Sequence, residues 1–549
     1  MDADKIIRRF NALESLRGPW EGIWQQCADY VLPRLGQHSK KNNHIFDSTA
    51  PLALDRFSAA FASSLTPRTV PWHGLVTGNE ALDRRQDVRR YLEEVTAILF
   101  RARYRPGANF DNQIQEVYES LGVHGTGVLL IEDDLGRGLR YTCIPVYQVY
   151  LAANAAGQPD TVFRLYKLTA RQAAEEFGDA LPDRIKRDAE DPVRMDNEFE
   201  FIHGVFPRWH HERDRAGSRN LPYVSVHVAR QCRAVVREGG YRTMPYAVSR
   251  FKVDPGEVYG RSPAMMVMSN IIMANEIKKS LLRAAQKMVD PPLLTPEQDM
   301  LEAYNLKAGA INYGGVNADG KQMILPLQID GNLPVGLEML ESERRVINDA
   351  FYITLFQILV EQGGQQTATE VIQRAQEKAQ IMAPPIGRQQ SELLRPIIER
   401  ELDIISAAGS LEGIEVPEVF RTLGGAAVEP KYETTINKTL NAGSGVSILQ
   451  AIEGLAPLAA IHSSVYDVIE PMSAARVVCE SFGVPALVMR TEEEAAALDQ
   501  QRQQEQESMM AMQMGQAAMQ GLESVSNAEK NLQQAQAMAQ GAPQSMMVQ

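Results

Sequence analysis

The sequence has few cysteines and no long apolar run. Its four cysteines, Cys27, Cys143, Cys232 and Cys479, lie far apart, with no CxxC pair and no spacing typical of metal ligands. This usage predicts buried free thiols in a reducing compartment. Nowhere do eighteen apolar residues follow one another, so no membrane span is expected. The charged first ten residues argue against a signal peptide.

Positive charge is also scarce. The 549 residues contain 56 Lys and Arg against 69 Asp and Glu, a formal net charge of −13. Neutralisation of phosphates supplies most DNA affinity, so a tight sequence-reading DNA binder is disfavoured. A protein through which DNA passes stays compatible, because like charge keeps the polymer weakly held. The apolar content of 44% and the length predict packed cores in roughly three or four structural units.

Motifs for catalysis and ligand binding are weak or absent. The stretch Gly315-Val-Asn-Ala-Asp-Gly320-Lys321-Gln322 is one residue from a P-loop, but Gln322 replaces the Ser or Thr that would hold magnesium, and a strand-like segment follows. A hairpin turn is therefore favoured there. The pair His210-His211 has no matching third metal ligand. We assign no catalytic, cofactor-binding or metal-binding residue and expect no enzyme activity.

The first 255 residues predict helices followed by an antiparallel sheet. One helix is expected to stop at Gly18-Pro19 and a second to run from Pro19 to Pro33. Further helices are expected over 49–67, 84–103 and 111–121. Segments typical of strands, with a helix over 169–177 among them, are 128–132, 140–151, 161–168, 199–208, 223–229 and 233–238.

Two long helices follow. One is expected from Pro263 to Val289, about 40 Å long, and another from Leu337 to Val360, about 36 Å long. The intervening residues are rich in Gly, Pro and Asn. Each helix carries a broad apolar band that two helices alone cannot hide; the band comprises Met265, Met266, Ile271, Ile272, Leu281, Leu282, Val346, Phe351, Tyr352, Leu355 and Phe356.

A polar loop and a second helical region come next. The loop comprises Glu361, Gln362, Gly363, Gly364, Gln365 and Gln366. Thr367-Ala-Thr-Glu370 has the pattern of a capping box and begins a helix that Pro384-Pro385 is expected to end. The last 50 residues contain 14 Gln, 8 Met and no aromatic residue. Such a tail is either disordered or a helix supported by neighbouring copies.

Several short motifs, in this order, resemble the head-to-tail connecting (portal) proteins of short-tailed phages. They are Arg17-Gly-Pro-Trp20, Cys27-Ala-Asp-Tyr-Val-Leu-Pro33, Phe46-Asp-Ser-Thr-Ala50, Leu65-Thr-Pro-Arg68, Pro71-Trp72, Val123-His-Gly-Thr-Gly127, Tyr259-Gly-Arg-Ser-Pro263 and Thr367-Ala-Thr-Glu370 with Arg374 and Glu377. The resemblance runs with gaps from about residue 5 to about residue 490. It implies a structural protein.

The resemblance implies an α+β subunit of a twelve-membered ring with a central channel. Its expected parts are a mixed α/β wing (1–255), a first stem helix (256–290), a small α/β clip (291–335), a second stem helix with tunnel loop (336–366), a helical crown (367–495) and a tail or barrel helix (496–549). The tunnel loop is the polar loop 361–366. It has no basic residue, which puts strong phosphate gripping in doubt.

The resemblance also implies partners and places. DNA or a neighbouring subunit would meet Lys278, Lys279, Arg283 and Lys287, which otherwise form a solvated helix face. The large terminase and then the tail adaptor would grip the clip at Pro291, Pro292, Asn317, Asp319 and Lys321. Other implied partners are double-stranded DNA in the channel, the major capsid and scaffolding proteins, and copies of the chain, but no membrane. The expected location is the capsid portal vertex of the virion, and the host cytoplasm during assembly.

Two other functions compete with this one. A tail adaptor or collar would also form a ring, but its length and helix pairing fit less well. A nucleotide-dependent packaging enzyme would need a good P-loop.

Overall fold

The structure of the chain is a computed structural model. It describes residues 1–32, 45–83, 85–134, 138–208, 220–294, 333–360 and 380–409, with shorter stretches between 307 and 327 and beyond 411. The chain divides into two units, Met1–Phe482 and Gly483–Gln549. The described residues of the second unit, scattered between 497 and 536, are all helical.

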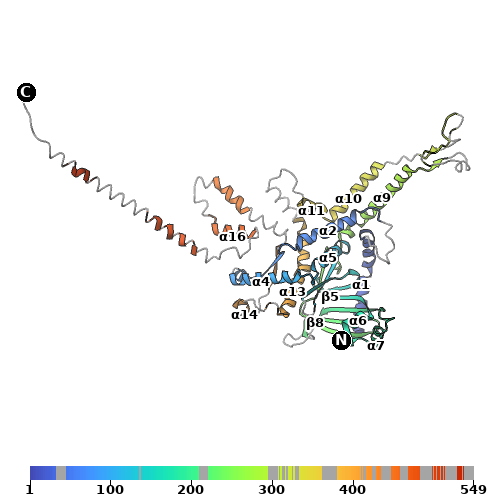
Figure 1. Cartoon of the computed structure of the whole chain (residues 1–549), viewed down its shortest axis with the longest axis horizontal. Helices are drawn as coiled ribbons and strands as arrows, with labels where there is room; N and C mark the ends of the chain where they lie inside the picture. Colours follow the sequence, from blue (N-terminus) through green and yellow to red (C-terminus); the bar gives the residue numbers. More distant parts are fainter. Residues whose placement is uncertain are drawn as a thin grey trace, which may run out of the picture. The chain divides into compact units, whose positions relative to one another are not determined.

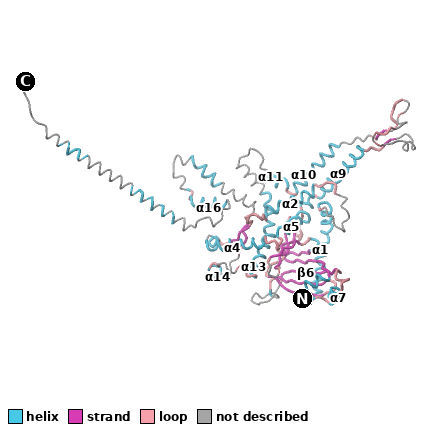
Figure 2. Tube along the Cα trace, viewed as in Figure 1, coloured by secondary structure: helices cyan, strands magenta, loops and turns pink. Residues whose placement is uncertain are grey.

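The two largest antiparallel sheets among the described residues lie in the first unit (Figures 1 and 2), where the sequence predicts antiparallel strands. The smaller has the strand order β3-β2-β9 and the larger β4-β5-β6-β7-β8. Their strands are β2 (Thr126–Asp133), β3 (Leu139–Cys143), β4 (Val149–Ala153), β5 (Pro159–Thr169), β6 (Glu198–Pro207), β7 (Tyr223–Ala229), β8 (Ala234–Tyr241) and β9 (Tyr246–Arg250). The segment 140–151, expected as one strand, is split by the 3-10 turn η1 (Val146–Gln148).

Helices surround these sheets, so the fold is α+β. Those before residue 255 are α1 (Ala3–Val31), α2 (Thr49–Leu65), α3 (Glu80–Asp83), α4 (Gln86–Arg103), α5 (Phe110–His124), α6 (Ala170–Phe177), η2 (Gly178–Ala180) and α7 (Asp183–Glu190). Later ones are α8 (Pro263–Met266), α9 (Met268–Val289), α10 (Leu333–Ala350), α11 (Ile353–Val360), η5 (Gln390–Leu394), α13 (Arg395–Ala407), α14 (Glu418–Thr422) and α16 (Pro471–Ser481). Thr169 caps α6 through a capping box with Gln172.

The expected break at Gly18-Pro19 is wrong, because α1 continues through it. Pro19 lies on the exposed side of the helix, where water can satisfy the carbonyl that proline leaves unpaired. The residues around it are anchored to the sheet. Arg17 Nη1 donates to the carbonyl oxygens of Tyr147 (2.7 Å) and Val149 (3.1 Å), and the Trp24 ring packs on Tyr259. Tertiary contacts therefore outweigh the local signal.

The same correction applies at Pro384-Pro385, where a helix end was expected. Residues 380–389 are helical and lead directly into the π-turn η5 and then α13. Pro384 is exposed, whereas Met382 and Ile386 are buried in the main core. Packing of the opposite face holds this helix together.

The two long helices are present, but each is interrupted. Ser262 caps the first, accepting from the Met265 amide at 3.0 Å, and Val267 separates α8 from α9. The second, expected to be continuous, breaks between α10 and α11 at Tyr352, which has a left-handed φ of 58°. The break allows Phe351 and Phe356 to pack on Phe57 and Phe61 of α2, each with ring centroids 6.0 Å apart.

Segments far apart in the sequence share one core. Strand β1 (His73–Val76) pairs antiparallel with β12 (Glu429–Tyr432), and α13 contacts β2, β9 and α4. The largest cluster of buried apolar residues includes side chains from α2, α5, α10 and α13. The C-terminal helical region is therefore built onto the N-terminal part.

Candidate assembly and channel surfaces

Two motifs of the sequence meet where the first long helix leaves the sheet. Residues 123–127 lie against residues 259–263: Ser262 Oγ donates to the Val123 carbonyl at 2.8 Å, and the Gly260 amide donates to Thr126 Oγ1 at 2.9 Å. Gly125 has φ 73°, and a Cβ there would overlap the Gly260 backbone. Only glycine fits this left-handed, close-packed position. The contact fixes the start of α8 against the start of β2.

Helices α9 and α10 run side by side and antiparallel beyond the sheets (Figure 1), and we call them the helix pair. Asn270 Nδ2 donates to Glu343 Oε2 at 2.8 Å. Nearer the far end, Leu281 lies so close to Gly336 that a Cβ on Gly336 would come within 2.8 Å of its side chain. These two contacts define the interhelical face of each helix.

One side of the helix pair is covered at its base by the chain's own segment 45–47, and we call it the Asp47 side. The amides of Phe46 and Asp47 donate to Asn275 Oδ1 at 2.7 and 2.9 Å. Arg344 Nη2 pairs with Asp47 Oδ2 at 2.7 Å. Burial raises the pKa of the Asp47 carboxyl, but its hydrogen bonds with Thr49 and Arg344 lower that pKa below its ordinary value. Further out on this side, Leu282 and Leu337 are exposed.

The opposite side of the helix pair is apolar and open. Met273 of α9, with Met339 and Val346 of α10, has side chains that are 48, 50 and 42% exposed. By helical geometry these residues lie across the interhelical contact from Asn275 and Arg344. Val335 continues the row one turn from Met339. We call this the methionine side.

The chain itself buries part of the apolar band that the sequence predicts and leaves the rest exposed. Ile271 and Phe351 are buried, and Leu355 and Phe356 are partly buried against the main core of the same chain. Met266, Leu282 and Val346 are exposed. Exposed apolar side chains that adjoin one another on one element, as Met339 and Val346 do with Met273 on the methionine side, indicate an interaction surface.

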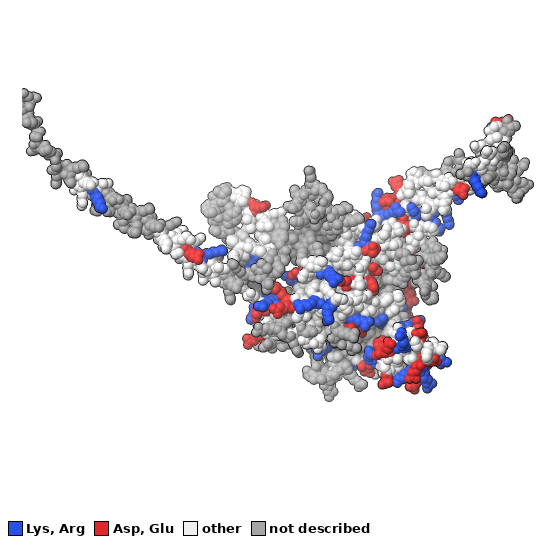
Figure 3. Space-filling view, viewed as in Figure 1, with Lys and Arg blue, Asp and Glu red and all other residues white. Residues whose placement is uncertain are grey.

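The four basic residues assigned to the first stem helix do not form one patch. Lys279, Arg283 and Lys287 are spaced by four and so share a face, whereas Lys278 lies on the Asp47 side. Lys279 is already paired with Glu276 at 2.9 Å and lies over the Phe46 ring at 5.6 Å. Arg283 and Lys287 are exposed. Figure 3 shows side chains of both charges on the face in view, without a large basic area.

The residues assigned to the clip are only partly described. Strand β10 (Leu293–Leu294), directly after Pro291 and Pro292, pairs antiparallel with β11 (Leu325–Pro326). Val316 bridges Gln322, with Gly320 at φ 75° in the turn that also holds Asp319 and Lys321. This confirms the hairpin in place of a P-loop. Asn317 lies outside the described residues, as do the tunnel loop Glu361–Gln366, the capping box at Thr367 and the pair His210-His211.

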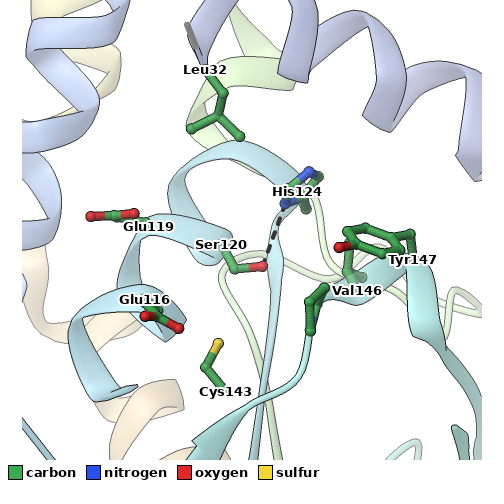
Figure 4. Close-up of a pocket in the computed structure, with 9 residues that line it drawn as sticks. Leu32, Glu116, Glu119, Ser120, His124, Cys143, Val146 and Tyr147 are labelled. Carbon is green, nitrogen blue, oxygen red and sulfur yellow. Dashed lines mark hydrogen bonds between the residues drawn. The ribbon is translucent and has the colours of Figure 1, made fainter. Parts of the chain in front are cut away.

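A small cavity of about 270 Å³ opens between α5, β3 and η1 (Figure 4). Burial and the nearby carboxylates of Glu116 and Asp55 raise the pKa of Glu119. Ser120 Oγ lies 3.4 Å from His124 Nδ1 but donates to the Thr126 carbonyl at 2.7 Å. Because its hydrogen is committed to a carbonyl, this serine is poorly placed as a nucleophile. The cavity shows no catalytic arrangement among its described residues.

All four cysteines are free in the structure, and burial raises the pKa of Cys27 and of Cys143 to about 12. Within the described parts of the chain, no group of three or more His, Cys, Asp or Glu side chains could hold a metal ion. In those same parts, no helix is both long and apolar enough to cross a membrane.

A buried ionic network, which no local sequence pattern predicts, joins the early and late parts of the first unit. Arg103 of α4 donates from Nε to Glu401 Oε1 of α13 at 2.8 Å and from Nη2 to Oε2. Both side chains are 0% exposed. Tyr141 also donates to Glu401, and His73 contacts Arg103 at 2.9 Å. Burial together with the Arg103 charge holds the pKa of His73 well below its usual range.

Comparison with known proteins identifies the family. The model of the family described as bacteriophage head to tail connecting protein matches residues 3–489. The chain therefore belongs to the bacteriophage head-to-tail connecting proteins. It is 25% identical over 560 residues to the portal protein of Salmonella phage epsilon15, covering 99% of each chain. It is also 25% identical over 529 residues to the probable portal protein of Bordetella phage BPP-1, covering 93% of each.

Among solved structures, the neck of an empty GTA particle, computed with C6 symmetry, matches at 10% identity. The match covers 69% of this chain and 90% of that one, with a TM-score of 0.33, too low to define the fold.

Proposed function

We propose that this head-to-tail connector, a portal protein, forms a closed ring of twelve copies around a channel for double-stranded DNA. Its role is structural rather than catalytic. The ring occupies one vertex of the capsid, and it is assembled in the host cytoplasm with the capsid and scaffolding proteins. Terminase and later the tail adaptor dock on the clip.

The observation that carries this proposal is the apolar surface on two sides of the helix pair. Met273 and Met339 are about half exposed on one side, and Leu282 and Leu337 are exposed on the other. A monomer would leave both sides in water. In a cyclic ring each subunit has a neighbour on either side, so both surfaces are covered at once through a heterologous interface that closes.

The channel assignment rests on Arg283 and Lys287. These exposed cations lie on a helix face outside the interhelical contact. Two contacts per subunit suit weak, non-specific holding of phosphates better than tight binding. The tunnel loop at 361–366 is proposed as the constriction, where polar glutamines contact the DNA without strong phosphate binding. The wing, crown and tail keep the ranges given above as part of this proposal.

Electron microscopy of the purified full-length chain tests the ring. We expect negative-stain class averages with a central hole, and a native mass of twelve chains. Introducing charge on the methionine side, as Met273→Asp with Met339→Asp, should strongly reduce the ring fraction. Val193→Asp is the matched control, since Val193 is exposed outside the helix pair. A wild-type protein that stays monomeric at all concentrations and salts contradicts the proposal.

The channel is tested separately on assembled rings. Arg283→Ala with Lys287→Ala should leave the rings intact and weaken the retention of short double-stranded DNA. It should also lower the slope of log affinity against log salt, because each lost phosphate contact removes about 0.9 from that slope. Unchanged retention and slope would place these two residues away from the DNA.

A further inference from the structure

The two sides of the helix pair differ in the charge that they leave unpaired. Lys278 lies one turn from Leu282 on the Asp47 side, and Glu338 lies one turn from Val335 at the outer edge of the methionine side. Within the described parts of the chain, neither Lys278 nor Glu338 has an ion-pair or hydrogen-bond partner. At the level of Leu281, the Asp47 side therefore offers an apolar surface with a free cation, and the methionine side an apolar surface with a free anion. Lys287, four turns from Met273, is a cation further out on the methionine side.

Lys278 and Glu338 lie at the same level along the helix pair. Leu281 packs on Gly336, and the helices run in opposite directions. Lys278 is three residues before Leu281, and Glu338 is two residues after Gly336. At about 1.5 Å of rise per residue, the two positions differ in level by only about one residue. By the same count, Leu282 is level with Val335.

A second copy of the chain is the occupant that fits both sides. A rotation about an axis along the helix pair keeps each residue at its level and brings the methionine side of one copy against the Asp47 side of the next. Glu338 then meets Lys278, and Val335 and Met339 meet Leu282 and Leu337. A two-fold pairing of methionine sides would instead leave both Asp47 sides, with Lys278 and Leu282, uncovered.

Resting on the proposed ring, we infer that adjacent subunits join head to tail through the helix pair, with Glu338 of one copy paired to Lys278 of the next. The inference fixes which side of the stem meets which, and so the direction in which the ring is built. The base of the Asp47 side is already occupied by the chain's own Asp47 and Arg344. The contact between copies is therefore made by the outer half of the helix pair.

Charge reversal in the full-length protein tests this pairing. The variants are Lys278→Glu, Glu338→Lys and the double variant, with Lys5→Glu as a control that makes the same charge change at an exposed position of α1, outside the helix pair. The fraction in rings is measured against subunit concentration by sedimentation velocity and native mass spectrometry. Circular dichroism melting shows whether each variant is folded.

We expect each single reversal to raise the concentration for half-assembly by about tenfold, because an attraction becomes a repulsion. The double variant should return to within about twofold of wild type, and Lys5→Glu should assemble normally. The pairing would be overturned by single variants that assemble like wild type, by a double variant no better than the singles, or by an equally harmful Lys5→Glu. In each case wild-type rings would leave the proposed function standing. Absence of wild-type rings would overturn both.

Discussion

Replacing Glu401 by glutamine removes the carboxylate that faces the fully buried guanidinium of Arg103. The two groups share a bidentate contact, with Nε to Oε1 at 2.8 Å, and the Arg103 guanidinium lies 4.5 Å from the centre of the Trp72 ring. Burial alone would lower the pKa of Arg103, but the Glu401 charge outweighs it and raises the pKa above its ordinary value. Because a guanidinium is not deprotonated in proteins near neutral pH, Arg103 stays charged in the variant, without its counterion.

The expected cost of Glu401→Gln is large. Breaking a buried ion pair by removing one partner costs about 3–5 kcal/mol, because the remaining charge is uncompensated. Since Glu401 lies on α13, the loss should appear as local opening of that helix, and of β12, whose partner strand β1 carries His73 in contact with Arg103. In free-energy terms this is roughly a hundred- to several-thousand-fold rise in the opening equilibrium.

Hydrogen exchange mass spectrometry of residues 395–407 and 429–432 measures that opening, with all variants at one protein concentration. The double variant Arg103→Met with Glu401→Leu removes both charges, and we expect it to exchange more slowly than Glu401→Gln. Two results would show that the network does not hold α13 in place. One is hydrogen exchange of Glu401→Gln at the wild-type rate, and the other is exchange of the double variant as fast as that of Glu401→Gln.

Three further predictions follow from single features of the fold. Gly125→Ala should lower the melting temperature far more than Gly157→Ala, because both glycines have positive φ but only the Cβ at position 125 would meet backbone; equal melting temperatures would refute this. His203 and His227 stack with ring centroids 4.0 Å apart, and burial lowers the pKa of both, that of His227 to about 3. Both histidines stay neutral in the folded protein, whereas in the unfolded chain they bind protons below about pH 6.5. The free energy of unfolding should therefore fall as the pH drops from 6.5 towards 3, by up to about 1.4 kcal/mol per pH unit for each histidine. His227→Gln should flatten the dependence of melting temperature on pH in that range, and an unchanged slope would contradict this assignment. Truncation after residue 495 should still give rings in negative stain, and monomers from the shortened chain would make the tail an assembly element.

Much of the fold follows from local patterns in the sequence. Strand segments such as β7 alternate apolar and polar residues, and turns end them. Ser262 caps α8, and Pro263 occupies its first position. Each of these features depends on interactions within a few residues of chain, so the folded protein retains it. The helix ends predicted at Pro19 and Pro384-Pro385 are not retained, because the opposite faces of those helices are held by buried contacts.

The surfaces were harder to predict than the elements. The long helices and their basic residues are visible in the sequence, but the side to which each residue belongs is set by contacts between distant segments. Asp47, which covers part of the helix pair, is 297 positions from its partner Arg344 in the sequence. Glu401 is 298 positions from Arg103. No periodicity encodes such contacts, so the free methionine side could be located only from the folded chain.

The pairing of β1 with β12 has a consequence for how the chain is made. Strand β1 is synthesised early, yet its hydrogen-bonding partner leaves the ribosome only about 350 residues later. Until then the aromatic cluster around Trp72 lacks both β12 and the helix that carries Glu401, so the nascent N-terminal half holds an unfinished edge and a buried cation without its anion. Because pairing between strands so far apart in the sequence is slow, we expect the nascent chain to depend on chaperones until its last third has been translated.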